Sequence, residues 1–168
     1  MRLIHYSRKK FDLEPRMYDQ SFVTWQAKPL GLWVSVEGPD DWKSWCEGEE
    51  FQLENLKFAY EVKLKKDSNL LYINSPQELL LFTKSYPFLR DQWKDREGER
   101  LCATYELDWL KVKKEYQGII ISEYFWDLRL ANECFWYGGW DCSSGCIWDL
   151  DCIEELRFIE ERSLVKVE

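Results

Sequence analysis

Asp141 is the residue of this sequence that is best placed to do chemistry. It lies within residues 135–151, which read FWYGGWDCSSGCIWDLD, after a run of aromatic residues and a Gly-Gly pair and before an apolar segment that predicts a strand. A carboxylate at the mouth of a strand, between aromatic faces and beside a flexible glycine turn, can be positioned against a flat, charged ligand. The pattern is also typical of a tight turn whose aromatic rings belong to the core, because Gly-Gly followed by Asp is ordinary turn chemistry. Both interpretations stay open on this stretch alone.

The only histidine, His5, is the second candidate. It lies near the end of a first predicted strand, residues 2–7, which also delivers Tyr6 and Ser7. A lone histidine is usually no more than a hydrogen-bonded residue. Its position at a strand end, before a polar segment, adds some weight to a functional role, and the structural interpretation stays open.

A second predicted strand, residues 31–36, supplies two more candidate functional residues. It is rich enough in β-branched and aromatic residues to be a central strand. Because side chains alternate along a strand, Trp33 and Ser35 share one of its faces.

Helix and strand signals follow one another along the rest of the chain. The clearest is Ser75-Pro76-Gln77-Glu78, a capping box with proline at the first helical position, which predicts a helix from there to about Tyr86. Asp41 and Asp108 are predicted to cap two further helices. The other predicted strands are residues 58–64, 70–74, 118–122, 145–150 and, at an edge, 155–167. Helices are inserted between more numerous strands, so the predicted class is α+β around a mixed or antiparallel sheet.

Length and composition limit the classes of fold and function that are open to the chain. The 168 residues suit a single domain over 1–168, with a charged loop or insertion at about 88–104 and a long loop, residues 11–29, that could cover a site. The 10 Trp, 9 Tyr and 9 Phe supply large buried area and often line ligand pockets. A net charge of −8 disfavours nonspecific binding to nucleic acid, because such binding needs a concentrated basic face. No apolar run approaches the length that spans a membrane.

The cysteines are interpreted as reduced thiols. The N-terminal residues 1–10 are basic and lack the apolar segment of a secretory signal, so we expect a cytoplasmic protein without structural disulfides. A zinc site on Cys142, Cys146 and Cys152 is disfavoured, because the chain has no paired C-x-x-C motif and its one histidine is far off in sequence. We therefore expect no metal. The six cysteines are Cys46, Cys102, Cys134, Cys142, Cys146 and Cys152.

Three motifs taken together resemble the ADP-ribosyltransferase superfamily: His5-Tyr6-Ser7 on a first strand, Gly31-Leu32-Trp33-Val34-Ser35 on a second, and an acid before a late Gly-Cys-Ile-Trp strand. The chain looks most like small phage-encoded members, including an anti-CRISPR enzyme, and residues 136–148 also look like a family of uncharacterised phage and bacterial proteins. The resemblance spans most of the chain through short motifs. It implies a mixed or antiparallel split β-sheet with a few short helices, and residence in the host cytoplasm if the chain is phage-encoded.

The resemblance implies a role for residues of both early strands. His5 matches the histidine that binds a ribose hydroxyl of NAD, and the backbone of Tyr6 matches the position that pairs with the nicotinamide carboxamide. Ser35 matches the second-strand serine that shapes the nicotinamide pocket, with Trp33 or a loop tyrosine as a stacking wall. The sequence departs from the family pattern at Tyr6, where a small residue is common.

Asp141 matches the late acid that holds the nicotinamide ribose and stabilises its developing positive charge, although the family's usual residue there is Glu. Breaking the nicotinamide glycosidic bond passes through an oxocarbenium-like state, so a nearby carboxylate gains interaction energy as the ring becomes cationic. Ser7 and Trp140 are also expected to contact NAD. Asp149 and Glu123 are the reserve candidates for the acid, Asp149 because it lies on the same predicted strand.

The function implied by the resemblance is an NAD-dependent ADP-ribosyltransferase. NAD is its substrate, and the acceptor of ADP-ribose is a protein or a nucleic acid, with a protein preferred. The alternative is a catalytically silent interaction or inhibitor protein on the same fold, supported by the net charge of −8 and by the non-standard acid. An RNA phosphotransferase is disfavoured, because no arginine-rich phosphate pocket is evident.

Overall fold

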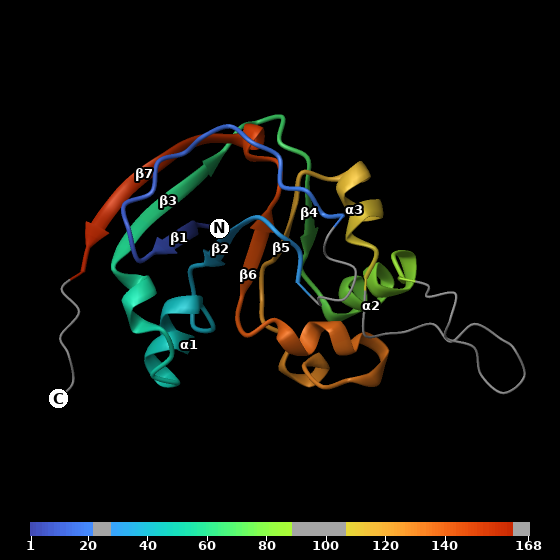
Figure 1. Ribbon diagram of the computed structural model, residues 1–168. Coiled ribbons are helices and arrows are strands. Elements are labelled where there is room, and N and C mark those ends of the chain that lie inside the picture. The colour runs from blue at the N-terminus through green and yellow to red at the C-terminus, as the bar shows by residue number, and fades with distance from the viewer. Residues whose placement is uncertain (22–27, 89–106, 163–168) are drawn as a thin grey trace, which may run out of the picture.

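The computed structural model describes residues 1–21, 28–88 and 107–162 (Figure 1). These residues form three α-helices, α1 (Trp42–Gly48), α2 (Pro76–Ser85) and α3 (Trp109–Glu115). The strands are β1 (Leu3–Ser7), β2 (Leu32–Val36), β3 (Phe58–Leu64), β4 (Leu70–Ile73), β5 (Gly118–Ile121), β6 (Ser144–Ile147) and β7 (Ile153–Glu161). Short 3-10 segments are η1 (Leu53–Leu56), η2 (Trp126–Leu128), η3 (Asn132–Gly139) and η4 (Leu150–Cys152).

The seven strands form one mixed sheet in the order β4-β5-β6-β2-β1-β3-β7. Only β4 and β5 are parallel, and the other neighbours are antiparallel. The predicted α+β class with a mixed sheet is therefore confirmed. The pairing of β1 with β2 is short, since it covers only Leu3 with Val36 and Ile4 with Ser35.

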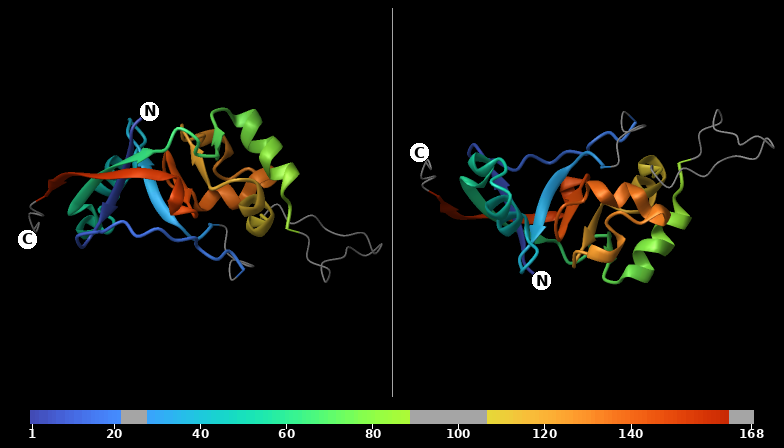
Figure 2. Two further views of the ribbon diagram at one scale, coloured as in Figure 1. Left: turned by 90° about the horizontal axis from the view of Figure 1, so that it is seen from above. Right: turned by 90° about the horizontal axis from the view of Figure 1, so that it is seen from below.

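The sheet separates two hydrophobic cores. Along β5, Ile119 and Ile121 belong to one core and Ile120 to the other, as alternation along a strand requires. The first core is packed by α2, α3 and η3, and Figure 2 shows α2 and η3 beside the β4–β5–β6 end of the sheet, away from β7. The second core is covered in part by the N-terminal segment through Phe11 and Leu13. The aromatic residues that the composition makes so frequent fill the first core.

The predicted helix starts are confirmed by their caps. The Asp41 carboxylate accepts the backbone N–H of Ser44 at 2.7 Å, the Ser75 hydroxyl accepts that of Glu78 at 3.2 Å, and the Asp108 carboxylate accepts that of Lys111 at 3.0 Å. Each cap satisfies a backbone donor that the first helical turn leaves without an intrahelical partner.

The prediction of a strand over residues 145–150 is wrong at its end. The strand β6 stops at Ile147, because the backbone N–H groups of Trp148 and Asp149 both donate to the carbonyl of Gln117, at 3.0 and 3.1 Å. Asp149 then accepts the N–H of Asp151 and begins η4. Asp149 is therefore not on the strand that follows Asp141, contrary to the expectation that makes it a reserve candidate for the acid.

Other predictions fall partly outside the described residues. The last strand, β7, begins at Ile153 rather than at residue 155, and the predicted positions 163–167 lie outside the described part. Of the expected loop at 11–29, residues 22–27 lie outside it, and so do residues 89–104 of the expected charged insertion and Cys102. No helix in the described ranges is long and apolar enough to cross a membrane.

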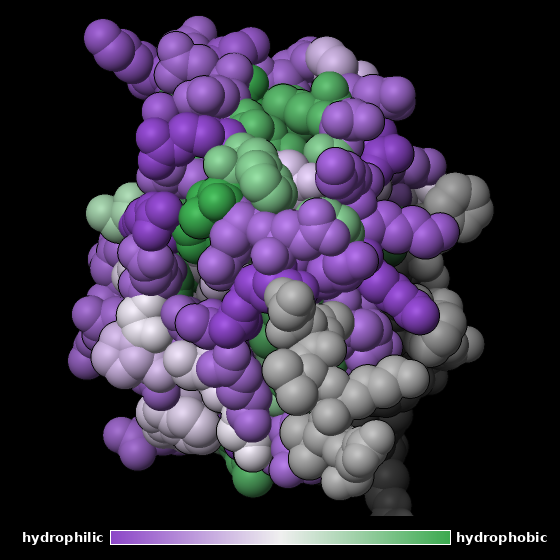
Figure 3. Space-filling view, turned by 90° about the vertical axis from the view of Figure 1, so that its left-hand side faces the viewer, coloured by the Kyte–Doolittle hydropathy of each residue, from purple (hydrophilic) through white to green (hydrophobic). Residues whose placement is uncertain are grey.

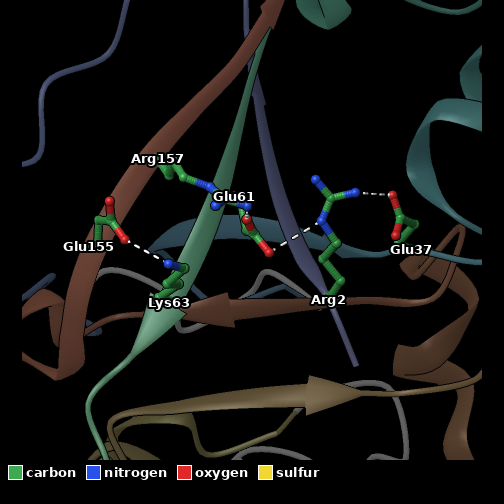
Figure 4. Close-up of polar contacts among 6 residues, drawn as sticks. All are labelled: Arg2, Glu37, Glu61, Lys63, Glu155 and Arg157. Atoms are coloured by element: carbon green, nitrogen blue, oxygen red, sulfur yellow. Dashed lines mark hydrogen bonds and ion pairs between the residues drawn. The ribbon is translucent and has the colours of Figure 1, made fainter.

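Ion pairs join Glu61 of β3 to Arg157 of β7 and to Arg2, which precedes β1, and Arg2 also pairs with Glu37, which follows β2. Arg2 donates to Glu37 at 2.7 Å and to Glu61 at 3.2 Å, and Arg157 contacts Glu61 from the other side (Figure 4). The side of the molecule that includes β7 is mostly hydrophilic, with a small hydrophobic area (Figure 3). Exposed ion pairs of this kind contribute little stability each. We interpret this face as a solvated surface.

Candidate functional site

A cavity of about 250 Å³ lies where β1 and β2 stop pairing. Its walls come from β1, β2, the start of α1 and the segment that leads into β6. Five of the residues singled out in the sequence line it: His5, Tyr6, Trp33, Ser35 and Asp141. Segments that are far apart in the chain thus meet at one hollow.

His5 bridges the two separating strands. Its Nδ1 lies 2.9 Å from the carbonyl oxygen of Trp33, and because a carbonyl only accepts, Nδ1 must carry the proton. Burial lowers the pKa of His5 below its usual value of 6.5. The ring is therefore neutral at neutral pH, and its Nε2 is available as an acceptor. The rings of Phe11 and Tyr60 hold it at centroid distances of 4.9 and 6.5 Å.

Asp141 is ion-paired within the cavity. The Nζ atom of Lys28 lies 3.1 Å from its Oδ2 atom, and the side chain of Asp141 is 24% exposed. The same Nζ lies 5.4 Å from the ring centroid of Trp33, within cation–π range. The cavity therefore already places one cation against both a carboxylate and an indole face.

Sequence reasoning missed Lys28. It is separated from Asp141 by 113 positions, and no local pattern distinguishes it from a solvated lysine. The only signal available was its place at the start of the segment that leads into the predicted strand of Trp33.

Trp33 forms a wall of the cavity, and Trp140 stands behind it. The two ring centroids are 4.8 Å apart, and Trp140 is fully buried in the first core. Trp140 does not line the cavity, so it supports the wall rather than forming it. Its Nε1 has no hydrogen-bond partner within the described part of the chain.

The two serines have local roles. The hydroxyl of Ser35 accepts the backbone N–H of Trp42 at 2.9 Å, which fixes the start of α1 and brings Trp42 to the cavity wall. The hydroxyl of Ser7 donates to the carbonyl of Lys9 at 2.6 Å, and Ser7 does not line the cavity. Ser35 therefore shapes the hollow through α1.

Tyr6 contributes a phenol that stays protonated. Burial raises its pKa to about 12, and the negative charge of Asp41 acts in the same direction. The hydroxyl therefore stays protonated at neutral pH, and Tyr6 is one of the residues that line the cavity.

Neither reserve acid lines the cavity. Asp149 accepts from Nε2 of Gln117 at 2.8 Å in a different region, and Glu123 is exposed in the loop after β5. Asp141 is the one of the three that borders the hollow, so the geometry selects it as the candidate acid.

The cysteines in the described ranges are all buried and unpaired. Burial raises the pKa of Cys142, at the cavity wall, to about 12, so its thiol is not a ready nucleophile. No group of three or more metal-ligating side chains occurs in the described residues.

No protein-family model, no curated protein and no solved structure matches the chain.

Proposed function

We propose that the chain is an NAD-dependent ADP-ribosyltransferase whose site is the cavity lined by His5, Trp33 and Asp141. The observation that carries the proposal is the place of Lys28, whose ammonium contacts the Asp141 carboxylate at 3.1 Å and lies 5.4 Å from the Trp33 ring centroid. A cation is stabilised there by a charge on one side and by a π face on the other. Cleavage of NAD requires a site of this kind, because positive charge moves onto the ribose as the bond breaks.

Few groups take part in the proposed reaction. The bond between the anomeric carbon and the nicotinamide nitrogen breaks, and its electron pair leaves with neutral nicotinamide. The ribose is left with oxocarbenium character, which the Asp141 carboxylate stabilises, as carboxylates do in glycosidases. A nucleophile of the acceptor then bonds to the anomeric carbon and releases its proton to solvent.

The other cavity residues position the ligand. Nε2 of the neutral His5 ring accepts from a ribose hydroxyl, and the Tyr6 phenol is a donor. Trp33, supported from behind by Trp140, offers a flat wall for the nicotinamide ring. The short pairing of β1 with β2 supports an ADP-ribosyltransferase-like arrangement. Beyond their two residue pairs the strands are not joined by a backbone ladder, and this is where the ligand would enter.

Lys28 has to give up its place when NAD binds. Its side chain is 40% exposed, so the ammonium can swing to solvent at small cost. The lysine and the cationic nicotinamide ring then compete for the same carboxylate and the same indole.

A second candidate function is a silent interaction protein on the same fold. The observation that favours it is that Lys28 neutralises the Asp141 carboxylate within the chain itself. The net charge of −8 would then serve to bind a basic partner.

The test is nicotinamide release from NAD, followed by chromatography, together with NAD binding by calorimetry. The wild type is compared with Asp141→Asn and with Asp149→Asn, a matched change outside the cavity. We expect Asp141→Asn to lower release by about a hundredfold to a thousandfold, the usual effect of removing one electrostatic stabiliser, and Asp149→Asn to retain activity. Circular dichroism controls for folding. A wild type that neither binds NAD nor releases nicotinamide would overturn the proposal in favour of the interaction protein.

A further inference from the structure

A second cavity, of about 200 Å³, shares the lining residue Asp141 with the first. It lies between α1 and the η2 segment, and its walls include Asp40, Trp45, Glu49 and Trp126. Asp141 borders both cavities. A group held in the second hollow would therefore lie next to the same residue, Asp141, that borders the first.

The chemistry of the second cavity is that of a cation site. Three carboxylates line it, and no lysine, arginine or histidine is among its lining residues. Neither Asp40 nor Glu49 forms an ion pair within the part of the chain that the structure describes. The pyrophosphate of NAD is disfavoured here, because the carboxylates of Asp40 and Glu49, which have no ion-pair partner among the described residues, repel it. This leaves the cavity to a different, cationic group.

Two indoles make the cavity suitable for a flat cation. Trp126 is 54% exposed, and its Nε1 donates to the Asp40 carboxylate at 3.2 Å, which orients the ring. Trp45 forms the α1 wall and stacks on Trp42 at a centroid distance of 5.1 Å. A guanidinium group stacks on indole faces and pairs with carboxylates through its planar array of donors, which a compact ammonium does less well.

Two further observations agree with this ligand class. Cζ of Arg129 lies 5.9 Å from the ring centroid of Trp126, so this indole already faces one guanidinium of the chain. Tyr124 packs edge-on against Trp126, and its buried hydroxyl has no hydrogen-bond partner in the described residues. Burial raises the pKa of Tyr124 to about 12; the positive charge of Arg129 opposes this rise, and the charges of Asp141 and Asp40 add to it. A neutral donor thus stands close to these carboxylates.

We propose that the second cavity is the acceptor site and that it takes an arginine side chain of a protein substrate. This inference rests on the function proposed above. The anomeric carbon loses nicotinamide, which keeps the electron pair of the broken bond, and a guanidinium nitrogen then forms the new bond to that carbon. The nitrogen gives up one proton, through the cavity carboxylates, to solvent. Asp141 stands between donor and acceptor because it borders both hollows.

The experiment uses agmatine as a small guanidine probe. Wild-type protein is incubated with NAD and agmatine, ADP-ribosyl-agmatine is measured by mass spectrometry, and nicotinamide release is measured in the same samples without agmatine. The variants are Glu49→Gln and Trp126→Leu, and the control is Glu54→Gln, an exposed acid outside both cavities. Each cavity variant is expected to lower transfer about tenfold, the effect of one lost charged or cation–π contact, while nicotinamide release stays within about twofold of the wild type.

The two proposals can fail separately. Nicotinamide release with transfer to agmatine that is unchanged in both cavity variants overturns the acceptor site and leaves the proposed function standing. A wild type that releases no nicotinamide overturns the proposed function. In that case, agmatine binding followed by tryptophan fluorescence decides whether the cavity is a guanidinium site: binding that is lost in Glu49→Gln and kept in Glu54→Gln supports it, and no binding by the wild type overturns it.

Discussion

The ring of His5 joins β1 to β2 just past the last backbone pair between them, because its Nδ1 donates to the carbonyl oxygen of Trp33 at 2.9 Å. A side chain thus does the work of a missing ladder hydrogen bond at the edge of the cavity. The contact requires a proton on Nδ1, and the buried surroundings disfavour a second proton on Nε2.

Acid is therefore expected to destabilise the protein through His5. Burial lowers the pKa of His5 from 6.5 in the folded state, so below about pH 6.5 the unfolded chain binds a proton that the folded chain resists. This stability is fully present above that pH and is lost as the pH falls toward the folded pKa. Urea unfolding at several pH values from about 5.5 to 7.5 measures it. His5→Gln keeps an amide donor but does not titrate, and an identical pH dependence in both proteins would refute the prediction.

Removal of the Lys28 ammonium is expected to tighten NAD binding. Lys28→Met frees the Asp141 carboxylate and the Trp33 face, and a partly exposed ion pair is worth up to about 1 kcal/mol, so the dissociation constant should fall by up to about fivefold. Calorimetric titration with NAD measures the change. The matched control is Lys63→Met, which removes a 2.9 Å ion pair with Glu155 on the exposed sheet face. Weaker binding by Lys28→Met would mean that the lysine holds the ligand instead of competing with it.

Ser35→Ala is expected to lower the free energy of unfolding by about 1 to 2 kcal/mol, because the backbone N–H of Trp42 loses its acceptor next to a buried position. Ser7→Ala is the control, since its hydrogen bond to Lys9 is exposed and should be worth little. Urea denaturation compares the two. Equal stabilities would show that water replaces the Ser35 hydroxyl at the start of α1.

Gly145→Ala is expected to destabilise the sheet by about 1 to 3 kcal/mol, because overpacking forces backbone shifts. A Cβ atom at this position would lie 2.5 Å from the carbonyl oxygen of Ile119 and 2.3 Å from Cδ1 of Ile120. The adjacent strands β5 and β6 would have to move apart. Gly38→Ala is the control, since a Cβ there meets nothing within 4 Å. Thermal unfolding measures both, and similar midpoints would contradict the prediction.

The parts of the fold that could be predicted from sequence are those with local causes. Asp41, Ser75 and Asp108 each cap a helix only three residues away, so the signal and the structure lie in the same short window. The parallel pairing of β4 with β5 joins strands separated by α2 and α3, and nothing local specifies it. The end of β6 was misplaced for the same reason, since the carbonyl of Gln117, some thirty positions earlier, takes the next two backbone donors.

In the candidate site, too, some residues could be predicted from local sequence signals and others could not. His5, Trp33 and Asp141 could be selected by residue type and by position near strand ends, and they meet at one cavity. Lys28 and the second cavity could not be found, because they depend on how residues far apart in the chain approach one another. Trp140, which is expected from the sequence to contact NAD, is fully buried and packs in the first core, which a sequence pattern does not reveal.

Because Trp33 contacts Trp140, ligand binding in the cavity can change the intrinsic tryptophan fluorescence of the protein. Trp33 lies at the cavity wall, Trp140 touches it from behind, and Trp109 lies 6.4 Å beyond Trp140, centroid to centroid. Excitation energy passes readily between indoles at such separations. A ligand that contacts Trp33 therefore also alters the fluorescence of Trp140 and Trp109. Occupancy of the cavity can therefore be followed by intrinsic fluorescence without any attached label.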